Sequence, residues 1–186
     1  RIICVSEAVK TYLEQQMWWS TDKLVTVYKG HDLAWYQQPA ADLGALNLPA
    51  GAFKVAMVAN LRAHKGLHVL IAATHHLPDE APIHILLVGP KPDDDAVLQA
   101  ISKAAHPERI HVLGYRDDAP EVAAACDIIV LPTTKREGLA RAVVEAMAYG
   151  RPAVISNSGG NAELVADGES GFVVPVNDPK ALAEGI

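Results

Sequence analysis

Short apolar runs rich in Val and Ile alternate along this chain with longer segments whose apolar residues recur at helical spacing. The short runs predict strands near residues 2–5, 24–28, 54–59, 83–88, 110–113, 127–131, 153–156 and 171–174. The longer segments predict helices near residues 7–17, 66–76, 94–104, 118–125, 138–149, 160–166 and 178–185. From residue 54 onward strands and helices alternate without a break, which is typical of an α/β fold. We therefore expect an open parallel sheet with helices on both faces.

Basic side chains follow the predicted strands. In an open parallel sheet the loops after the strands share one edge, and ligands bind there. Those loops contain six of the 16 Lys and Arg residues of the chain. They are Arg62, Lys65, Lys91, Arg116, Lys135 and Arg136. Solvated charge on loops would be the structural alternative, but the convergence of five loops on one edge favours an anion-binding site.

The segment 62–66 is the first candidate for that site. Arg62 and Lys65 precede the helix predicted over 66–76, and the free N–H groups at the start of a helix point back toward the loop. A phosphate at this point would meet the helix dipole and two fixed cations. A surface Arg and Lys on a turn would be the structural alternative.

Two glutamates bracket the second candidate. Glu137 stands at the start of the helix predicted over 138–149, and Glu145 follows eight residues later, about 12 Å along a helix axis. The carboxylates of a glycosidase pair stand about 5 to 9.5 Å apart, so this spacing argues against that role. It suits a long polar ligand held at both ends, with a diphosphate over the helix N-terminus. The structural alternatives are an ion pair between Glu145 and Arg141, and a helix-start role for Glu137.

The order of these motifs resembles the C-terminal domain of family-4 retaining glycosyltransferases. The matching residues are 62–66, Gly114, 125–132, Glu137 with 145–152, Gly159 and Gly160 with Glu163, and 167–172. The resemblance spans residues 24–186, and residues 1–9 resemble the last strand of the family's N-terminal domain. It implies the GT-B fold, of which this chain would supply the Rossmann-like half, and a glycosyltransferase activity of the hexosyltransferase type.

The resemblance also implies a division of the chain. Residues 1–23 would end a missing N-terminal domain and its linker helix. Residues 24–52 would form an interdomain strand and loop, and residues 53–186 would form the nucleotide-sugar-binding domain. Residue 1 is Arg, directly before a strand-like run, and the helical pattern at residues 179–186 has no cap. We therefore expect both ends to be cuts through a longer protein, and the isolated fragment to be inactive.

Residue roles follow from the same resemblance. The counterparts of Arg62 and Lys65 bind the donor diphosphate, that of Glu137 faces the donor sugar, and that of Glu145 binds the ribose hydroxyls. These roles imply a nucleotide-diphosphate-sugar donor and a metal-independent, retaining transfer in which Arg62, Lys65 and Glu137 are the catalytic set. The implied further donor contacts are Gly138, Leu139 and Ala140, with Gly114, Tyr115 and Arg116 near the base.

The chain departs from the family pattern at the turn Tyr28-Lys29-Gly30, where Pro-Asn-Gly is common, and at three consecutive positions farther on. Leu139, Ala140 and Arg141 stand where Phe, Gly and Leu are common, so the donor sugar stays open and Arg141 has no assigned role. The residues do not choose among UDP, GDP and ADP sugars, and a UDP-sugar is our working choice. For Glu163, in the turn 157–163, we favour a structural role in capping a helix and holding the turn.

Composition narrows the class of partner. The net charge of −6 argues against a nucleic-acid binder, and no apolar run approaches the ~18 to 20 residues that span a bilayer. Cys4 and Cys126 lie in or beside apolar runs, which favours buried thiols in a reducing compartment.

No metal-ligand spacing occurs, and Asp93, Asp94 and Asp95 read as the acidic start of a helix, so we expect neither a metal nor another cofactor. The expected partners are the nucleotide sugar, the missing N-terminal domain and an acceptor glycan or lipid-linked glycan, such as a glycan of the bacterial envelope. We expect a cytoplasmic enzyme, with peripheral attachment at the inner face of the membrane left open.

Two other functions stay open at this point. A sugar-nucleotide 2-epimerase of the same fold would share the donor half but would use no acceptor. A non-catalytic nucleotide-binding module would act as a regulatory or assembly subunit. A nicotinamide dehydrogenase and a P-loop ATPase are disfavoured, because neither Gly-x-Gly-x-x-Gly at a helix start nor Gly-x-x-x-x-Gly-Lys-Ser/Thr occurs.

Overall fold

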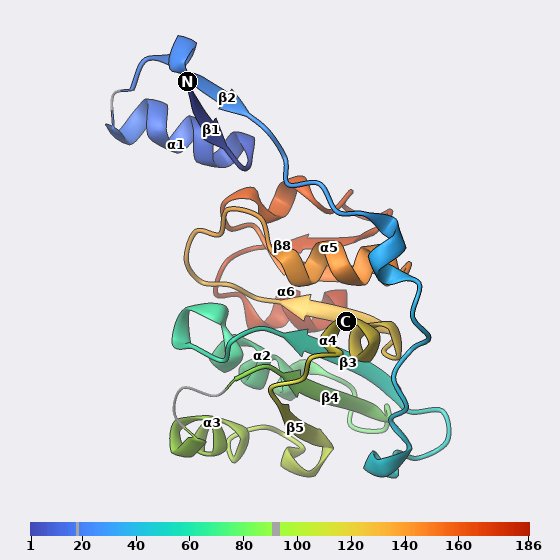
Figure 1. The fold of residues 1–186 in the computed structure, drawn as a ribbon. Helices are drawn as coiled ribbons and strands as arrows, with labels where there is room; N and C mark the ends of the chain where they lie inside the picture. The colour runs from blue at the N-terminus through green and yellow to red at the C-terminus, as the bar shows by residue number, and fades with distance from the viewer. Residues whose placement is uncertain (18, 91–93) are drawn as a thin grey trace.

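The computed structural model describes residues 1–17, 19–90 and 94–186 (Figure 1). The strands are β1 Ile2–Cys4, β2 Leu24–Thr26, β3 Phe53–Val58, β4 Ile83–Val88, β5 Ile110–Gly114, β6 Ile128–Leu131, β7 Ala153–Ser156 and β8 Gly171–Val174. The α-helices are α1 Glu7–Met17, α2 Leu67–Ala73, α3 Asp94–Ile101, α4 Ala119–Ala124, α5 Arg141–Ala148 and α6 Pro179–Gly185. The 3-10 helices are η1 Thr21–Lys23, η2 Leu33–Tyr36, η3 Gly44–Leu46, η4 Ala63–Lys65, η5 Thr74–His76, η6 Pro107–Arg109 and η7 Gly160–Glu163.

The strands form two parallel sheets. The large sheet has the order β5-β4-β3-β6-β7-β8, with every neighbouring pair parallel. This arrangement confirms the predicted α/β fold. β1 and β2 pair in a separate two-stranded sheet, which with α1 makes up an N-terminal unit, residues 1–26, drawn in blue in Figure 1. The division of the chain into domains stays a prediction.

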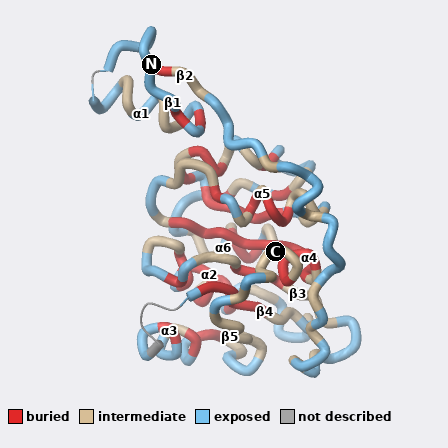
Figure 2. Tube along the Cα trace, viewed as in Figure 1, coloured by how far each residue is buried: buried red, intermediate tan, exposed pale blue. Residues whose placement is uncertain are grey.

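Aliphatic side chains cover both faces of the large sheet. On one face Val55 of β3 packs in a cluster with Leu70 of α2 and Leu182 of α6. On the other face Leu86 of β4 belongs to a cluster with Val143 of α5. Strands buried on both faces need nearly continuous apolar sequence, which is why the apolar runs located them within two residues. Figure 2 shows the buried residues concentrated in these strands.

The helix predicted over 94–104 ends as α3 at Ile101, and three other predicted helices are also shorter than expected by three residues or more. The helix predicted over 66–76 ends as α2 at Ala73, followed by the 3-10 turn η5. The helix predicted over 160–166 is only the 3-10 turn η7, because the amide of Ala166 donates to Ser170 Oγ at 3.0 Å and turns the chain toward β8. The helix predicted over 138–149 begins three residues late, as α5 at Arg141, because Glu137 is held in a bridge with Gly159.

Cys4 and Cys126 are free and buried, as the sequence predicted. Desolvation by burial raises the pKa of the Cys126 thiol to about 12, so that thiol is unreactive at neutral pH. No helix within residues 1–17, 19–90 and 94–186 is long and apolar enough to cross a membrane.

Candidate functional site

The strand order of the large sheet reverses beside β3. β4 and β5 lie on one side of β3, whereas β6, β7 and β8 lie on the other. α2 follows β3 onto one face of the sheet, and α5 follows β6 onto the opposite face. In an open parallel sheet such a reversal marks the ligand-binding crevice, which here would lie at the carboxyl ends of β3 and β6. The loops 59–66 and 132–140 border this crevice.

An ion pair joins the two loops. Lys65 Nζ donates to Glu137 Oε1 at 2.7 Å and to Oε2 at 2.8 Å. The Lys65 and Glu137 side chains are 15% and 19% exposed, so water screens their attraction much less than at the open surface. The sequence placed both residues on this edge of the sheet but did not predict that they contact each other.

Backbone contacts hold Lys65 in place. The amide of Thr134 donates to the carbonyl of His64 at 2.9 Å, which ties the loop after β6 to the turn η4. Gly66 ends that turn in the left-handed region, with φ of 84°, and α2 begins at the next residue. Arg62 directly precedes η4, and its side chain is exposed on the same loop.

The predicted helix start at residue 138 is wrong, because α5 begins at Arg141. Glu137 instead forms a β-bridge with Gly159, and the amide of Gly160 donates to the Glu137 carbonyl at 2.9 Å. These contacts hold the backbone of Glu137 extended, so the helix cannot begin there. The segment from Gly138 to Ala140 is therefore a loop.

Buried Asn161 occupies one amide of that loop. Its Oδ1 accepts from the amide of Ala140 at 3.1 Å. Ala140 was predicted to contact the donor, but its amide already has a partner in Asn161. The amides of Gly138 and Leu139 precede it on the same half-buried loop.

Glu145 lies one turn into α5 and is nearly buried, with 8% of its side chain exposed. Its Oε1 accepts from Arg141 Nε at 2.5 Å. This hydrogen bond is the first cause of the raised pKa of Arg141, and the attraction of the Glu145 charge adds to it. The structure thus contains the ion pair between Arg141 and Glu145 that the sequence offered as the structural alternative. The spacing of about 12 Å between Glu137 and Glu145 along one helix is wrong, since only residues from Arg141 onward are helical.

The loop after β5 carries the three residues predicted near the base. Gly114 ends β5, and its carbonyl accepts from the amide of Gly89 at 2.8 Å. The Tyr115 side chain is exposed and donates to Asp117 at 2.8 Å. Arg116 donates from Nε and from one terminal nitrogen to the two oxygens of Asp118, at 2.7 and 2.6 Å.

These hydrogen bonds change the pKa values of the groups on that loop. The bond to Asp117 raises the pKa of Tyr115, and the bond to Asp118 raises the pKa of Arg116. The Arg116 guanidinium in turn lowers the pKa of Asp118 despite the opposing effect of burial. The charge of Arg116 is therefore largely neutralised before any ligand arrives.

The six basic residues predicted on this edge have different environments. Lys65 is paired with Glu137 and Arg116 with Asp118, whereas Arg62 and Lys135 are exposed. The guanidinium of Arg136 lies 4.1 Å from the ring centroid of Tyr12. Lys91 lies outside the described residues, as does Asp93. Within the described part of the chain, no group of three or more His, Cys, Asp or Glu could hold a metal ion.

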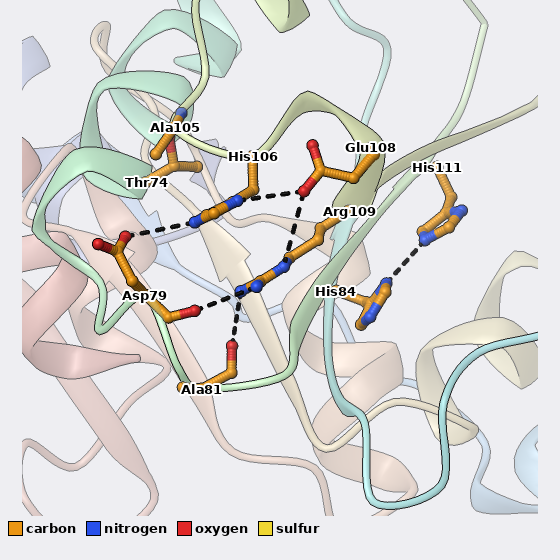
Figure 3. Close-up of polar contacts among 9 residues, drawn as sticks. All are labelled: Thr74, Asp79, Ala81, His84, Ala105, His106, Glu108, Arg109 and His111. Carbon is orange, nitrogen blue, oxygen red and sulfur yellow. Dashed lines mark hydrogen bonds and ion pairs between the residues drawn. The ribbon is translucent and has the colours of Figure 1, made fainter.

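A second polar cluster lies away from this crevice, near the start of β4 and β5 (Figure 3). His84 Nδ1 and His111 Nε2 are 3.0 Å apart, and the two rings are stacked. Desolvation by burial lowers the pKa of both rings, assisted at His84 by the charge of Arg109 and at His111 by His84. The sequence did not indicate this contact, because the pairing depends on the register of β4 and β5.

Acid should weaken the fold through this histidine pair. The folded-state pKa of each ring is below the ordinary value of about 6.5, so the unfolded chain binds more protons between those two values. The free energy of unfolding should fall as the pH drops below about 6.5. Above about pH 6.5 the histidine pair should not change the free energy of unfolding. Urea unfolding at acid and neutral pH measures the effect. His111→Gln should reduce the acid-induced loss, whereas His68→Gln, at an exposed position in α2, should retain it.

The sequence alone missed the partner of Glu163. The Glu163 carboxylate accepts from the amides of Glu7 and Ala8, at 3.0 and 2.7 Å, and from the Tyr28 hydroxyl at 2.6 Å. The predicted structural role is confirmed, but the helix that Glu163 caps is α1, far away in the sequence. No local pattern could have indicated this contact.

A parallel sheet in this strand order, with a paired lysine and glutamate at the point of reversal, defines a Rossmann-like ligand-binding domain. The family model "Glycosyl transferases group 1" matches residues 41–186. The chain is 29% identical over 147 residues to the lipopolysaccharide core biosynthesis glycosyltransferase LpsE of Rhizobium meliloti, covering 79% of this chain and 42% of that protein.

Two further comparisons cover nearly the whole chain. The UDP-Gal:alpha-D-GlcNAc-diphosphoundecaprenol alpha-1,3-galactosyltransferase of Escherichia coli is 28% identical over 189 residues, which are 96% of this chain and 48% of that protein. The crystal structure of Anabaena Alr3699/HepE in complex with UDP and glucose superposes with a TM-score of 0.84 and 29% identity, over 98% of this chain and 51% of that one. The chain therefore belongs to the group 1 glycosyl transferases, of the family-4 type with the GT-B fold. It spans about half the length of these relatives.

Proposed function

We propose that this chain binds a nucleotide-diphosphate sugar, in the first place a UDP-sugar, and is the donor half of a metal-independent, retaining glycosyltransferase. The ion pair between Lys65 and Glu137 at the carboxyl ends of β3 and β6 carries this proposal. The relative named for UDP-Gal and the Anabaena structure that contains UDP and glucose support the choice of donor.

Lys65 can contact a phosphate without leaving Glu137. An ammonium group has three N–H donors, and the two contacts to Glu137 leave at least one of them for a further acceptor. As the glycosyl bond breaks, negative charge builds on the departing diphosphate. Lys65 and the exposed Arg62 stabilise that charge where a metal ion would otherwise do so. Glu137 orients the ammonium and offers its oxygens to hydroxyls of the donor sugar.

Backbone amides supply the remaining positive end of the site. The amides of Arg141 and Ala142, in the first turn of α5, have no intrahelical acceptor. With the amides of Gly138 and Leu139 they line the approach to Glu137 and are available to phosphate oxygens. Ala140 contributes through Asn161, which fixes the loop, rather than through a bond of its own to the donor.

The nucleoside is held farther along the same edge. Glu145 bonds Arg141 through Oε1, so its Oε2 is available to the ribose hydroxyls while the guanidinium compensates the buried charge. The exposed ring of Tyr115, at the end of β5 after Gly114, offers a face on which a base can stack. Arg116 holds the next turn of that loop through Asp118.

We propose that the acceptor binds to a domain outside this chain, which spans about half the length of its relatives. The names of the relatives, with a lipopolysaccharide core in one and a diphosphoundecaprenol carrier in the other, support a glycan or lipid-linked glycan of the cell envelope. An enzyme with such an acceptor would work in the cytoplasm, where attachment to the inner face of the membrane would bring it to a lipid-linked acceptor.

Calorimetry tests the donor site directly. In excess EDTA the complete enzyme should still bind UDP, because fixed cations and amides replace the metal. It should bind GDP and ADP more weakly than UDP. Failure to bind any nucleoside diphosphate, or binding that returns only with added Mg²⁺, would contradict the proposal. Product analysis with a UDP-sugar then separates transfer from epimerisation, since only transfer places the sugar on an acceptor.

A further inference from the structure

The start of α1 is held by a side chain from the far end of the chain. Glu163, in η7, accepts hydrogen bonds from the amides of Glu7 and Ala8, while Ser6 Oγ accepts from the amide of Val9 at 3.2 Å. The first amides of a helix have no intrahelical acceptor, and a carboxylate at this position also meets the positive end of the helix dipole. Glu163 is 155 residues away from Ala8, so the cap joins two separate parts of the molecule.

The same carboxylate holds the segment that follows β2. The Tyr28 hydroxyl donates to Glu163 Oε2 at 2.6 Å. Glu163 therefore holds the N-terminal unit at two points, the start of α1 and the segment just after β2. Burial raises the pKa of Glu163, but the bonds from Tyr28, Ala8 and Glu7 outweigh it and lower the pKa overall, so the carboxylate is charged at neutral pH.

Close packing supports these hydrogen bonds. Gly160 contacts the N-terminal unit so closely that a Cβ there would lie 2.6 Å from Ser6 Cβ. Gly138, next to Glu137, packs against Val5 in the same way, with 3.0 Å from an ideal Cβ to a Val5 methyl. The loop of the proposed donor site and the N-terminal unit are thus in direct contact.

These contacts border a cleft that includes the proposed donor-sugar residue. A cavity of about 270 Å³ has Ala8, Val9 and Tyr12 of α1 on one side. The opposite side consists of Arg136, Glu137, Gly138 and Gly159. Arg136 also spans the cleft, stacking on the Tyr12 ring. The position of α1 therefore sets the width of the cleft in front of Glu137.

We propose that Glu163 is a positioning residue that fixes α1 opposite Glu137 and so sets the geometry of the cleft in which the glycosyl group is transferred. This inference rests on the proposed function. Glu163 touches neither Lys65 nor Glu137, and it acts through α1 and Tyr28. Replacement of Glu163 should leave the donor site intact but allow α1, on the opposite side of the cleft, to move.

A distance measurement tests the position of α1 without reference to activity. Spin labels on Gln15→Cys in α1 and Lys135→Cys in the loop before Glu137 report the width, since both positions are exposed and the native thiols are buried. In the complete enzyme, pulsed EPR should give one narrow distance distribution. Glu163→Ala should broaden it, and Glu163→Gln, which retains one carbonyl oxygen, should give an intermediate width. Glu184→Ala, at an exposed glutamate of α6, is the matched control and should change nothing.

Kinetics then separate positioning from a general structural role. Glu163→Ala should lower kcat for transfer by about tenfold to 10²-fold, because α1 would no longer be held in position at the cleft. The Kd for UDP should stay the same. Tyr28→Phe removes only one of the three hydrogen bonds and should cause a smaller loss in the same direction. An unchanged distance distribution, or a kcat equal to that of the parent enzyme, would overturn the proposal. A parent enzyme that fails to bind UDP would instead overturn the proposed function.

Discussion

Lys65→Ala should reduce transfer by about 10²- to 10³-fold in kcat, the usual loss when one stabiliser of transition-state charge is removed. The substitution removes the cation that we propose faces the departing diphosphate, and it leaves the partly buried carboxylate of Glu137 without its partner. The affinity for UDP should also fall, by roughly 10- to 150-fold, because one charge-assisted hydrogen bond contributes about 1.5–3 kcal/mol. Steady-state kinetics and calorimetry on the complete enzyme measure the two effects.

Lys103→Ala provides the matched control for this loss. Lys103 has the same charge and an exposed side chain, but it lies between α3 and β5, outside the loops at the carboxyl ends of the strands. Its removal should leave kcat within the scatter of the parent enzyme. The double variant Lys65→Ala with Glu137→Ala should lose less than the two single losses combined, since the pair acts as a unit. Unchanged transfer by Lys65→Ala would remove the central residue from the proposed site.

Gly66→Ala should destabilise the fold by about 2–5 kcal/mol, combining left-handed strain with an overpacking clash. Gly66 has φ of 84°, and an ideal Cβ at this position would lie 1.8 Å from the carbonyl oxygen of Pro132. The obstacle is backbone, so no side chain can rotate away. The loops after β3 and β6 would have to separate, which would also draw Lys65 away from Glu137. Urea unfolding monitored by circular dichroism measures the loss.

Gly150→Ala isolates the steric part of that loss. Gly150 also has a left-handed backbone, with φ of 70°, but nothing lies within 4 Å of an ideal Cβ there. Its substitution should cost only about 1–2 kcal/mol from backbone strain. UDP binding should persist in Gly150→Ala and weaken in Gly66→Ala. Equal losses of stability in the two variants would show that the contact with Pro132 is unimportant.

The pattern of apolar residues was sufficient for the fold but not for the contacts within the site. Buried parallel strands are apolar at nearly every position, as in Ile128–Leu131, so their location is a local property of the sequence. The start of α5 is not local. It depends on the bridge between Glu137 and Gly159 and on the bond from Ala140 to Asn161, which lies 21 residues farther on. Helical spacing alone placed that start three residues too early.

Pairs of charged residues followed the same rule. The ion pair of Arg141 with Glu145 spans one helical turn and was foreseen as an alternative to ligand binding. The pair of Lys65 with Glu137 spans 72 residues, and the sequence did not predict it. The cap on α1 by Glu163 connects residues still farther apart. The sequence could assign each of these groups to an edge of the sheet, but only the packing of loops against one another decides which groups meet.

The long separation between Lys65 and Glu137 has a consequence for biosynthesis. A ribosome adds roughly 5–20 residues per second, so Glu137 follows Lys65 by about 4 to 14 seconds. β3 pairs with β6 only after residues 128–131 have also been made. During that interval Lys65 has no glutamate partner, and the edge of β3 that later pairs with β6 is uncovered. A donor site of the kind we propose, which needs the Lys65–Glu137 pair, can therefore form only after residue 137 has been made and β6 has paired with β3.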